Sequence, residues 1–177
     1  MTRMWLFPLA VTYFLLVNGG ALLAAEPVLQ EPKGPVILTV TGKIGRANGT
    51  DVANRPVARF DRAMLEAMAQ REIMTETPWH EGAPRFAGPK ASALIAAVQA
   101  SGETARAIAL NDFVVEIPTV EWRRDDFILA ITQNGAPMSV REKGPIFVIY
   151  FYKGVPKEKV GLLYNKSIWQ LTRVEFR

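Results

Sequence analysis

The complete absence of cysteine is the feature that most limits what this chain of 177 residues can fold into. Without thiols it forms no disulfide, offers no thiolate to a metal and has no nucleophilic sulfur. A single histidine, His80, leaves ordinary zinc sites and Ser-His or Cys-His catalysis poorly supplied as well. The formal net charge of +4, with no basic run carrying interleaved aromatic residues, does not indicate nucleic-acid binding. The fold must therefore depend on a hydrophobic core, and the length suits one domain better than two.

The first 25 residues have the layout of a secretory signal peptide. Arg3 lies in a short positive start, residues 4–17 are almost purely apolar, and the small residues Ala24 and Ala25 precede Glu26. This apolar stretch is too short for a comfortable membrane span. We expect cleavage near Ala25 and export to the periplasm, with an uncleaved anchor as the alternative. Residues 26–35, polar and rich in proline, are then a tether to a domain over residues 36–177.

Strand signals outnumber helix signals along the rest of the chain. Apolar or alternating runs bounded by glycine, proline and asparagine predict strands, and Asp61 is a good N-cap for one of two helices. The pair Asn134-Gly135 is a strong hairpin signal. Because the helices are interspersed, we expect an α+β fold with a single mixed-sheet domain. The expected strands are residues 36–41, 73–77, 105–110, 113–117, 127–132, 139–140, 146–151 and 167–176, and the expected helices are 62–70 and 91–100.

Taken in order, these segments resemble the oxidoreductase molybdopterin-binding domain, which has the sulfite-oxidase fold. The resemblance implies that fold, with a few short helices, for residues 36–177. No single piece is specific, and the order and spacing carry the likeness. The matching pieces are Leu38–Gly42, then Phe86–Pro89 before Leu94-Ile95, then Ala109–Phe113 with Ile117-Pro118, then Leu129-Ala130, Asn134-Gly135 and Gly144-Pro145, and finally Lys166–Trp169.

The chain departs from the catalytic members of this family at one decisive place. Their molybdenum is bound by a cysteine thiolate just upstream of a loop, where this chain has residues 75–79, Thr-Glu-Thr-Pro-Trp. A neutral threonine hydroxyl is a poor substitute for a soft thiolate. The chain is therefore similar to the exported, cysteine-free, PruR-like members of the family, which bind simple pterins. That likeness implies a reduced pterin without molybdenum.

In that group the pterin-binding protein acts on the periplasmic domain of an inner-membrane diguanylate cyclase/phosphodiesterase. The resemblance thus implies a role in cyclic-di-GMP signalling and biofilm regulation, and no catalytic residue. Two alternatives stay open. One is a molybdopterin-dependent oxidoreductase whose molybdenum is held only by the cofactor's dithiolene, and the other is an interaction module with an empty pocket.

A flat pterin bicycle needs an aromatic platform and a few converging polar groups. The loop that begins at residue 75 offers Trp79 as that platform, unless it only staples the loop to the domain surface. His80 next to it is a candidate ligand contact or proton shuttle, or a solvated loop side chain. Thr77 occupies roughly the place of the lost thiolate and can hydrogen-bond the ring, or it is a strand-end hydroxyl.

Further candidates come from other parts of the chain. Asn111 and Asp112 interrupt two apolar strands, where a turn is the plainer explanation, and the aspartate can pair with the two donors of an amino-pyrimidinone. Arg123 lies in a cluster of mixed charge and faces either the same pocket, a protein partner or solvent. Arg141 and Lys143 are weaker candidates of the same kind. We expect no metal site formed by side chains.

Overall fold

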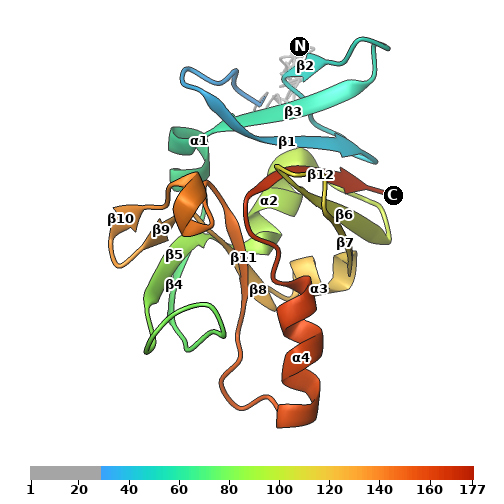
Figure 1. Ribbon diagram of the computed structural model, residues 1–177. Coiled ribbons are helices and arrows are strands. Elements are labelled where there is room, and N and C mark those ends of the chain that lie inside the picture. Colours follow the sequence, from blue (N-terminus) through green and yellow to red (C-terminus); the bar gives the residue numbers. More distant parts are fainter. Residues whose placement is uncertain (1–28) are drawn as a thin grey trace, which may run out of the picture.

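The computed structural model describes residues 29–177, and Figure 1 shows how their strands and helices are arranged. The expected signal peptide over residues 1–25 lies outside the described residues, as does the start of the expected tether. Within the described part, no helix is both long enough and apolar enough to cross a membrane. Strands and short helices alternate along the chain, so the predicted mixed α+β class is confirmed.

Six strands form the larger sheet, in the order β2-β3-β1-β12-β6-β7. Strands β1 and β12 run parallel and the other neighbouring pairs run antiparallel. Side chains alternate across the sheet: Leu38, Val40 and Val174 are buried in the core, whereas Thr39 and Arg173 line a hollow on the other face. The strands are β1 (Val36–Gly42), β2 (Gly49–Thr50), β3 (Pro56–Asp61), β6 (Thr104–Ala109), β7 (Val114–Pro118) and β12 (Leu171–Phe176).

The remaining strands form a four-stranded sheet, β10-β9-β5-β4, and a two-stranded pair, β11-β8. Every residue of β8 and β11 is buried, which confirms the apolar run from residue 146 as core. A Cβ on Gly88 of β5 would lie 2.0 Å from the Leu129 carbonyl oxygen of β8, so glycine permits the close approach of these strands. The bounds are β4 (Gln70–Met74), β5 (Arg85–Pro89), β8 (Phe127–Ala130), β9 (Thr132–Gln133), β10 (Ala136–Pro137) and β11 (Phe147–Tyr150).

Short helices connect these sheets. Helix α1 begins after Asp61, whose carboxylate accepts a hydrogen bond from the Met64 backbone N–H, as its N-cap position predicts. Helix α2 ends at Gln99, which adopts the left-handed conformation with φ of 50°. The helices are α1 (Arg62–Glu66), α2 (Ala91–Val98), α3 (Thr119–Arg123), the 3₁₀ turn η1 (Val140–Glu142) and α4 (Lys157–Lys166).

Some expected boundaries are wrong. Helix α1 stops at Glu66 rather than residue 70, because the Gln70 side-chain amide donates to the Leu65 and Met68 carbonyls, and Gln70 itself opens β4. Residues 139–140 form no strand, since Ser139 and Glu142 close a capping box around η1. The last strand begins at Leu171, not at residue 167. The sequence pattern does not predict α3 or α4.

Candidate functional site

A compact turn in the loop between β4 and β5 presents Trp79 and His80. Thr77, only 7% exposed, holds this turn through its hydroxyl. Its Oγ1 lies 2.6 Å from His80 Nδ1 and accepts a hydrogen bond of 3.3 Å from the Trp79 backbone N–H. The His80 N–H in turn donates to the Thr77 carbonyl at 3.4 Å. The threonine therefore positions the two rings that follow it, and its hydroxyl is already engaged.

Trp79 lies at the centre of an aromatic cluster. Its ring makes edge-to-face contacts with Phe147, Tyr164 and Trp169, at centroid distances of 5.6, 5.5 and 5.5 Å. These partners come from β11, from α4 and from the segment just before β12, so the tryptophan ties the loop to three other parts of the fold. Trp169 at the rim remains 38% exposed. The cluster thus packs Trp79 against three rings, while part of Trp169 stays accessible to solvent.

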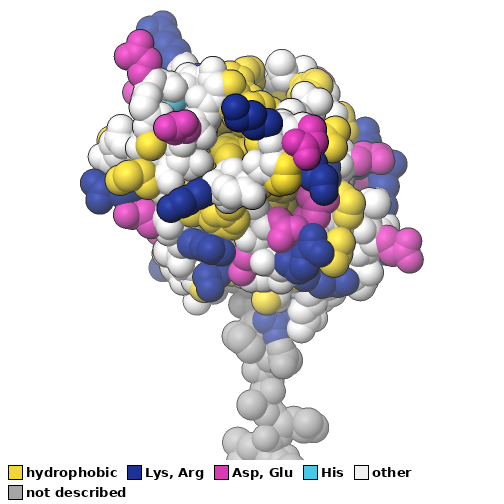
Figure 2. Space-filling model, turned by 90° about the horizontal axis from the view of Figure 1, so that it is seen from below, with side chains coloured by type: hydrophobic (Ala, Val, Ile, Leu, Met, Phe, Trp, Pro, Cys, Tyr) yellow, Lys and Arg dark blue, Asp and Glu magenta, His cyan; other side chains and the backbone are white. Residues whose placement is uncertain are grey.

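A cleft of about 410 Å³ opens beside this cluster. Its walls include Trp79 and Trp169, and Asn111 reaches it from the turn between β6 and β7. The other lining residues are Phe113, Tyr164, Asn165, Ser167 and Ile168. Figure 2 views the molecule from the α4 end, where hydrophobic surface lies in hollows bordered by charged side chains. The cleft is therefore mainly aromatic, with amide groups among its walls.

A second cavity, of about 310 Å³, lies on the His80 side of the loop. It is lined by residues of the β9–β10 hairpin and of η1, and by Arg141 and Lys143. Burial, followed by the positive charge of Lys143, lowers the pKa of His80 below its ordinary value of 6.5. His80 is therefore neutral near pH 7. Lys143 also lies over the Trp169 ring, with its Nζ 5.6 Å from the centroid, and so links this cavity to the aromatic cluster.

The other two predicted site residues lie elsewhere. Asp112 is exposed, adopts a positive φ of 63° in the β6–β7 turn, and forms an ion pair with Arg173 on the open face of the six-stranded sheet. Arg123 lies at the exposed end of α3, beside the fully buried Trp122. The structure thus joins Thr77, Trp79 and His80 in one turn, places Asn111 beside Trp79 in the cleft, and separates Asp112 and Arg123 from them.

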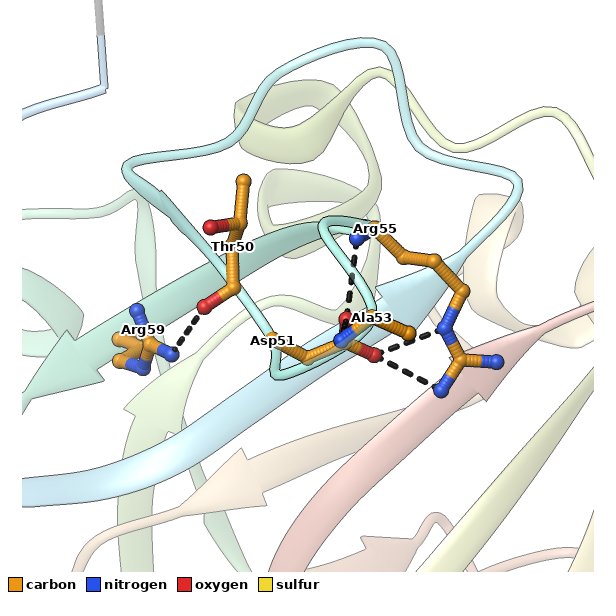
Figure 3. A network of polar contacts seen from close by, with 5 residues as sticks. All are labelled: Thr50, Asp51, Ala53, Arg55 and Arg59. Atoms are coloured by element: carbon orange, nitrogen blue, oxygen red, sulfur yellow. Dashed lines mark hydrogen bonds and ion pairs between the residues drawn. The ribbon is translucent and has the colours of Figure 1, made fainter.

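Asp112 instead borders a polar hollow of about 680 Å³ on that open sheet face. Its far wall is the turn between β2 and β3, shown in Figure 3. There Asp51 accepts hydrogen bonds from the Ala53 and Arg55 backbone N–H groups and from the Arg55 side chain, and the Arg55 contacts lower the pKa of its carboxyl. The charged residues that line the hollow are thus paired with one another: Asp51 with Arg55, Asp112 with Arg173, and Glu175 with Arg106.

Comparison with solved structures gives a likeness in fold. The chain superposes on the crystal structure of the sulfane dehydrogenase SoxCD from Paracoccus pantotrophus with a TM-score of 0.57. The two folds are alike. The match covers 78% of this chain but 37% of the other, so this chain spans well under half of its length, and the sequence identity is 14%. No family model and no curated protein matches the sequence.

The sequence interpretation names two of the eight residues that line the aromatic cleft, Trp79 and Asn111, and misses the other six. Tyr164 and Asn165 belong to α4, which it does not predict, although Val160, Leu163 and Tyr164 have the spacing of one helical face. Trp169 stands in the Lys166–Trp169 segment that carries the family resemblance, but nothing local indicates that it meets Trp79. The helical spacing of these residues, together with Pro156 at the start of α4, is the sequence signal that could have predicted the helix.

Proposed function

We propose that the protein binds a pterin in the cleft between Trp79 and Trp169. The observation that supports this most is the set of three aromatic rings, those of Trp79, Tyr164 and Trp169, lining one cleft together with the amides of Asn111 and Asn165. Aromatic contacts stabilise a flat bicycle by about 0.5–1.5 kcal/mol beyond its burial. An amide supplies both donors and an acceptor, as the pyrimidinone edge of a pterin requires. The cleft volume of about 410 Å³ falls within the usual range of small-molecule sites.

The threonines upstream of the loop do not fit the role of a molybdenum ligand. Thr75 donates its hydroxyl to the Glu76 carbonyl, and the Thr77 hydroxyl is shared between His80 and the Trp79 N–H. Both are neutral oxygen groups already in hydrogen bonds, whereas the family's metal is bound by a soft thiolate. Among residues 29–177, no group of three His, Cys, Asp or Glu side chains is placed to hold a metal ion. The ligand that we propose is a simple, reduced pterin, and the support for its reduced state is the resemblance to the PruR-like group.

We further propose that the protein is exported to the periplasm and regulates the periplasmic domain of an inner-membrane diguanylate cyclase/phosphodiesterase. The support for this finer proposal is the sequence resemblance to the PruR-like group. Ligand binding shifts such a partner only by its differential affinity for two states of the protein surface. The loop that carries Trp79 is the natural reporter, because Trp79 belongs both to its turn and to the wall of the cleft.

An oxidoreductase remains the second candidate, because the solved structure with the similar fold is a sulfane dehydrogenase. In that case molybdenum would be held by the cofactor's dithiolene alone. Elemental analysis of the purified protein separates the candidates, since stoichiometric molybdenum supports the enzyme and its absence, with pterin bound, supports the regulator.

Titration with a fluorescent oxidised pterin, and with a reduced pterin followed by tryptophan fluorescence, tests the binding proposal. We expect saturable quenching in the wild-type protein and at least about tenfold weaker binding in Trp169→Ala, which corresponds to about 1.4 kcal/mol. Leu162→Ala is the matched control, because Leu162 is an exposed apolar residue of α4 that does not line the cleft. Absence of quenching in the wild type, or equal binding by Trp169→Ala, would refute pterin binding in this cleft.

A further inference from the structure

A fourth cavity, which shares only Tyr164 with the aromatic cleft, lies between the end of β4 and helix α4. Its volume is about 610 Å³. Met74, which is 70% exposed, and Glu76 line it from one side, while Tyr152, Lys153, Lys157 and Tyr164 line it from the other. Tyr152 and Tyr164 are in ring contact at 4.9 Å, so they form one continuous apolar wall. The cavity therefore offers a concave surface that an inserted side chain can fill.

Strand β4 has an unused edge beside this cavity. It is the terminal strand of the four-stranded sheet and pairs with β5 alone. Within the described residues, the backbone of Gln70–Met74 makes no hydrogen bond to any other segment. An unpaired edge of this kind is a template for an added strand. The main-chain groups of β4 are thus available to an extended peptide.

The charges around the cavity are mainly positive. Lys153 and Lys157 are exposed and make no ion pair within residues 29–177. Glu76 is the single acidic residue that lines the cavity. A ligand that complements this surface carries negative charge.

We propose that this surface, which we call the β4–α4 groove, docks an extended acidic segment of a protein partner. The segment adds to the edge of β4, places an apolar side chain against Tyr152 and Tyr164, and directs acidic side chains towards Lys153 and Lys157. A concave surface beside a free strand edge fits a chain with projecting side chains better than it fits a flat bilayer surface. The groove docks the segment whether or not the aromatic cleft holds a ligand.

A fluorescein-labelled peptide of alternating glutamate and leucine is a suitable probe, with fluorescence anisotropy on the purified protein as the measurement. We expect saturable binding that weakens at higher salt and falls at least about tenfold in the double variant Lys153→Glu/Lys157→Glu. Lys43→Glu is the matched control, because it reverses the charge of an exposed side chain just after β1, and it should leave peptide binding unchanged. A peptide with lysine in place of glutamate should not bind.

Two further measurements can overturn the proposal. N-methylation of alternate peptide bonds in the probe removes its strand-pairing N–H groups, so undiminished binding of that peptide would contradict strand addition to β4. Anionic phospholipid vesicles that sediment the protein through Lys153 and Lys157, while no acidic peptide binds, would show a membrane contact in place of a peptide groove. Trp169→Ala keeps peptide binding while abolishing pterin binding, so failure of one proposal is distinguishable from failure of the other.

Discussion

Replacing Trp79 by alanine separates the structural role of the aromatic cluster from its role in binding. Truncating a fully buried tryptophan costs about 3–5 kcal/mol. Trp79 is only partly buried, but it makes three edge-to-face contacts, each of which contributes roughly 0.5–1.5 kcal/mol. We therefore expect Trp79→Ala to lower the free energy of unfolding by about 3 kcal/mol.

Trp169 provides the comparison, because it belongs to the same cluster at its exposed rim. It contacts Trp79 and Phe147 by ring edges and Lys143 by its face, but 38% of its surface is exposed. Trp169→Ala should therefore cost about 1 kcal/mol. Both variants are expected to lose pterin binding. Trp79→Ala and Trp169→Ala should therefore differ in the free energy of unfolding but not in their effect on binding.

Urea unfolding followed by far-ultraviolet circular dichroism measures both free energies. Unchanged m-values would show that the native and unfolded states remain comparable between variants. A double-mutant cycle with Tyr164→Ala should return a coupling of about 1 kcal/mol with Trp79. The reasoning is refuted if Trp79→Ala costs less than Trp169→Ala, because the loop would then not depend on the three contacts.

Three other perturbations test separate parts of the fold. Gly88→Ala places a methyl group 2.0 Å from the Leu129 carbonyl oxygen, so urea unfolding should show a free energy of unfolding lower by about 3 kcal/mol. Gly161→Ala, which has open space around it in α4, should raise that free energy by about 1 kcal/mol. Because the pKa of His80 is lowered in the folded state, the imidazole of the unfolded chain binds a proton at a higher pH than that of the folded chain. The free energy of unfolding should therefore fall as the pH drops below 6.5. His80→Gln should remove this pH dependence from denaturation curves measured across pH. Glu121→Gln breaks an ion pair of 2.6 Å with Lys166 at a site where the carboxylate is 13% exposed, and thermal unfolding should report a loss of about 3 kcal/mol. An unchanged melting temperature would assign that pair to the solvated surface.

Local patterns in the sequence predict the elements whose partners are near in the chain. The strand over Val36–Gly42 and the hairpin of β6 and β7 follow from alternation and from the Asn111-Asp112 turn. Helix α3, in contrast, has five residues, too few for a helical period to be recognised. The burial of Trp122 depends on contacts with Phe127 and Phe176, of which the second is far away in the chain. Charged residues flank Trp122 in the sequence, so the local pattern predicts an exposed position rather than the buried one that its contact with Phe176 produces.

The candidate site divides in the same way. The turn that joins Thr77, Trp79 and His80 is local, although the sequence pattern predicts only a strand end and an irregular loop there. The remaining walls come from Asn111 and Trp169, which lie well over twenty residues away and reach the cleft only through the sheet topology. Asn111 and Asp112 are adjacent, yet the positive φ of Asp112 turns the second towards the opposite face of the sheet. Sequence proximity therefore singles out Thr77, Trp79 and His80 as neighbours but does not predict the cleft.

The hydrogen bonds of Thr77 bear on the proposal of a pterin ligand without a metal bound by side chains. One hydroxyl oxygen accepts from the Trp79 N–H and meets His80 Nδ1, and so it sets the position of both rings. A thiol in its place is a weaker acceptor, so it would hold the turn less firmly while leaving its sulfur free for a metal. A residue at this position thus either holds the turn, as threonine does, or leaves a sulfur free for a metal ion, as cysteine would. In this chain the Thr77 hydroxyl stabilises the turn that carries Trp79, and Trp169 at the rim of the same cluster is 38% exposed.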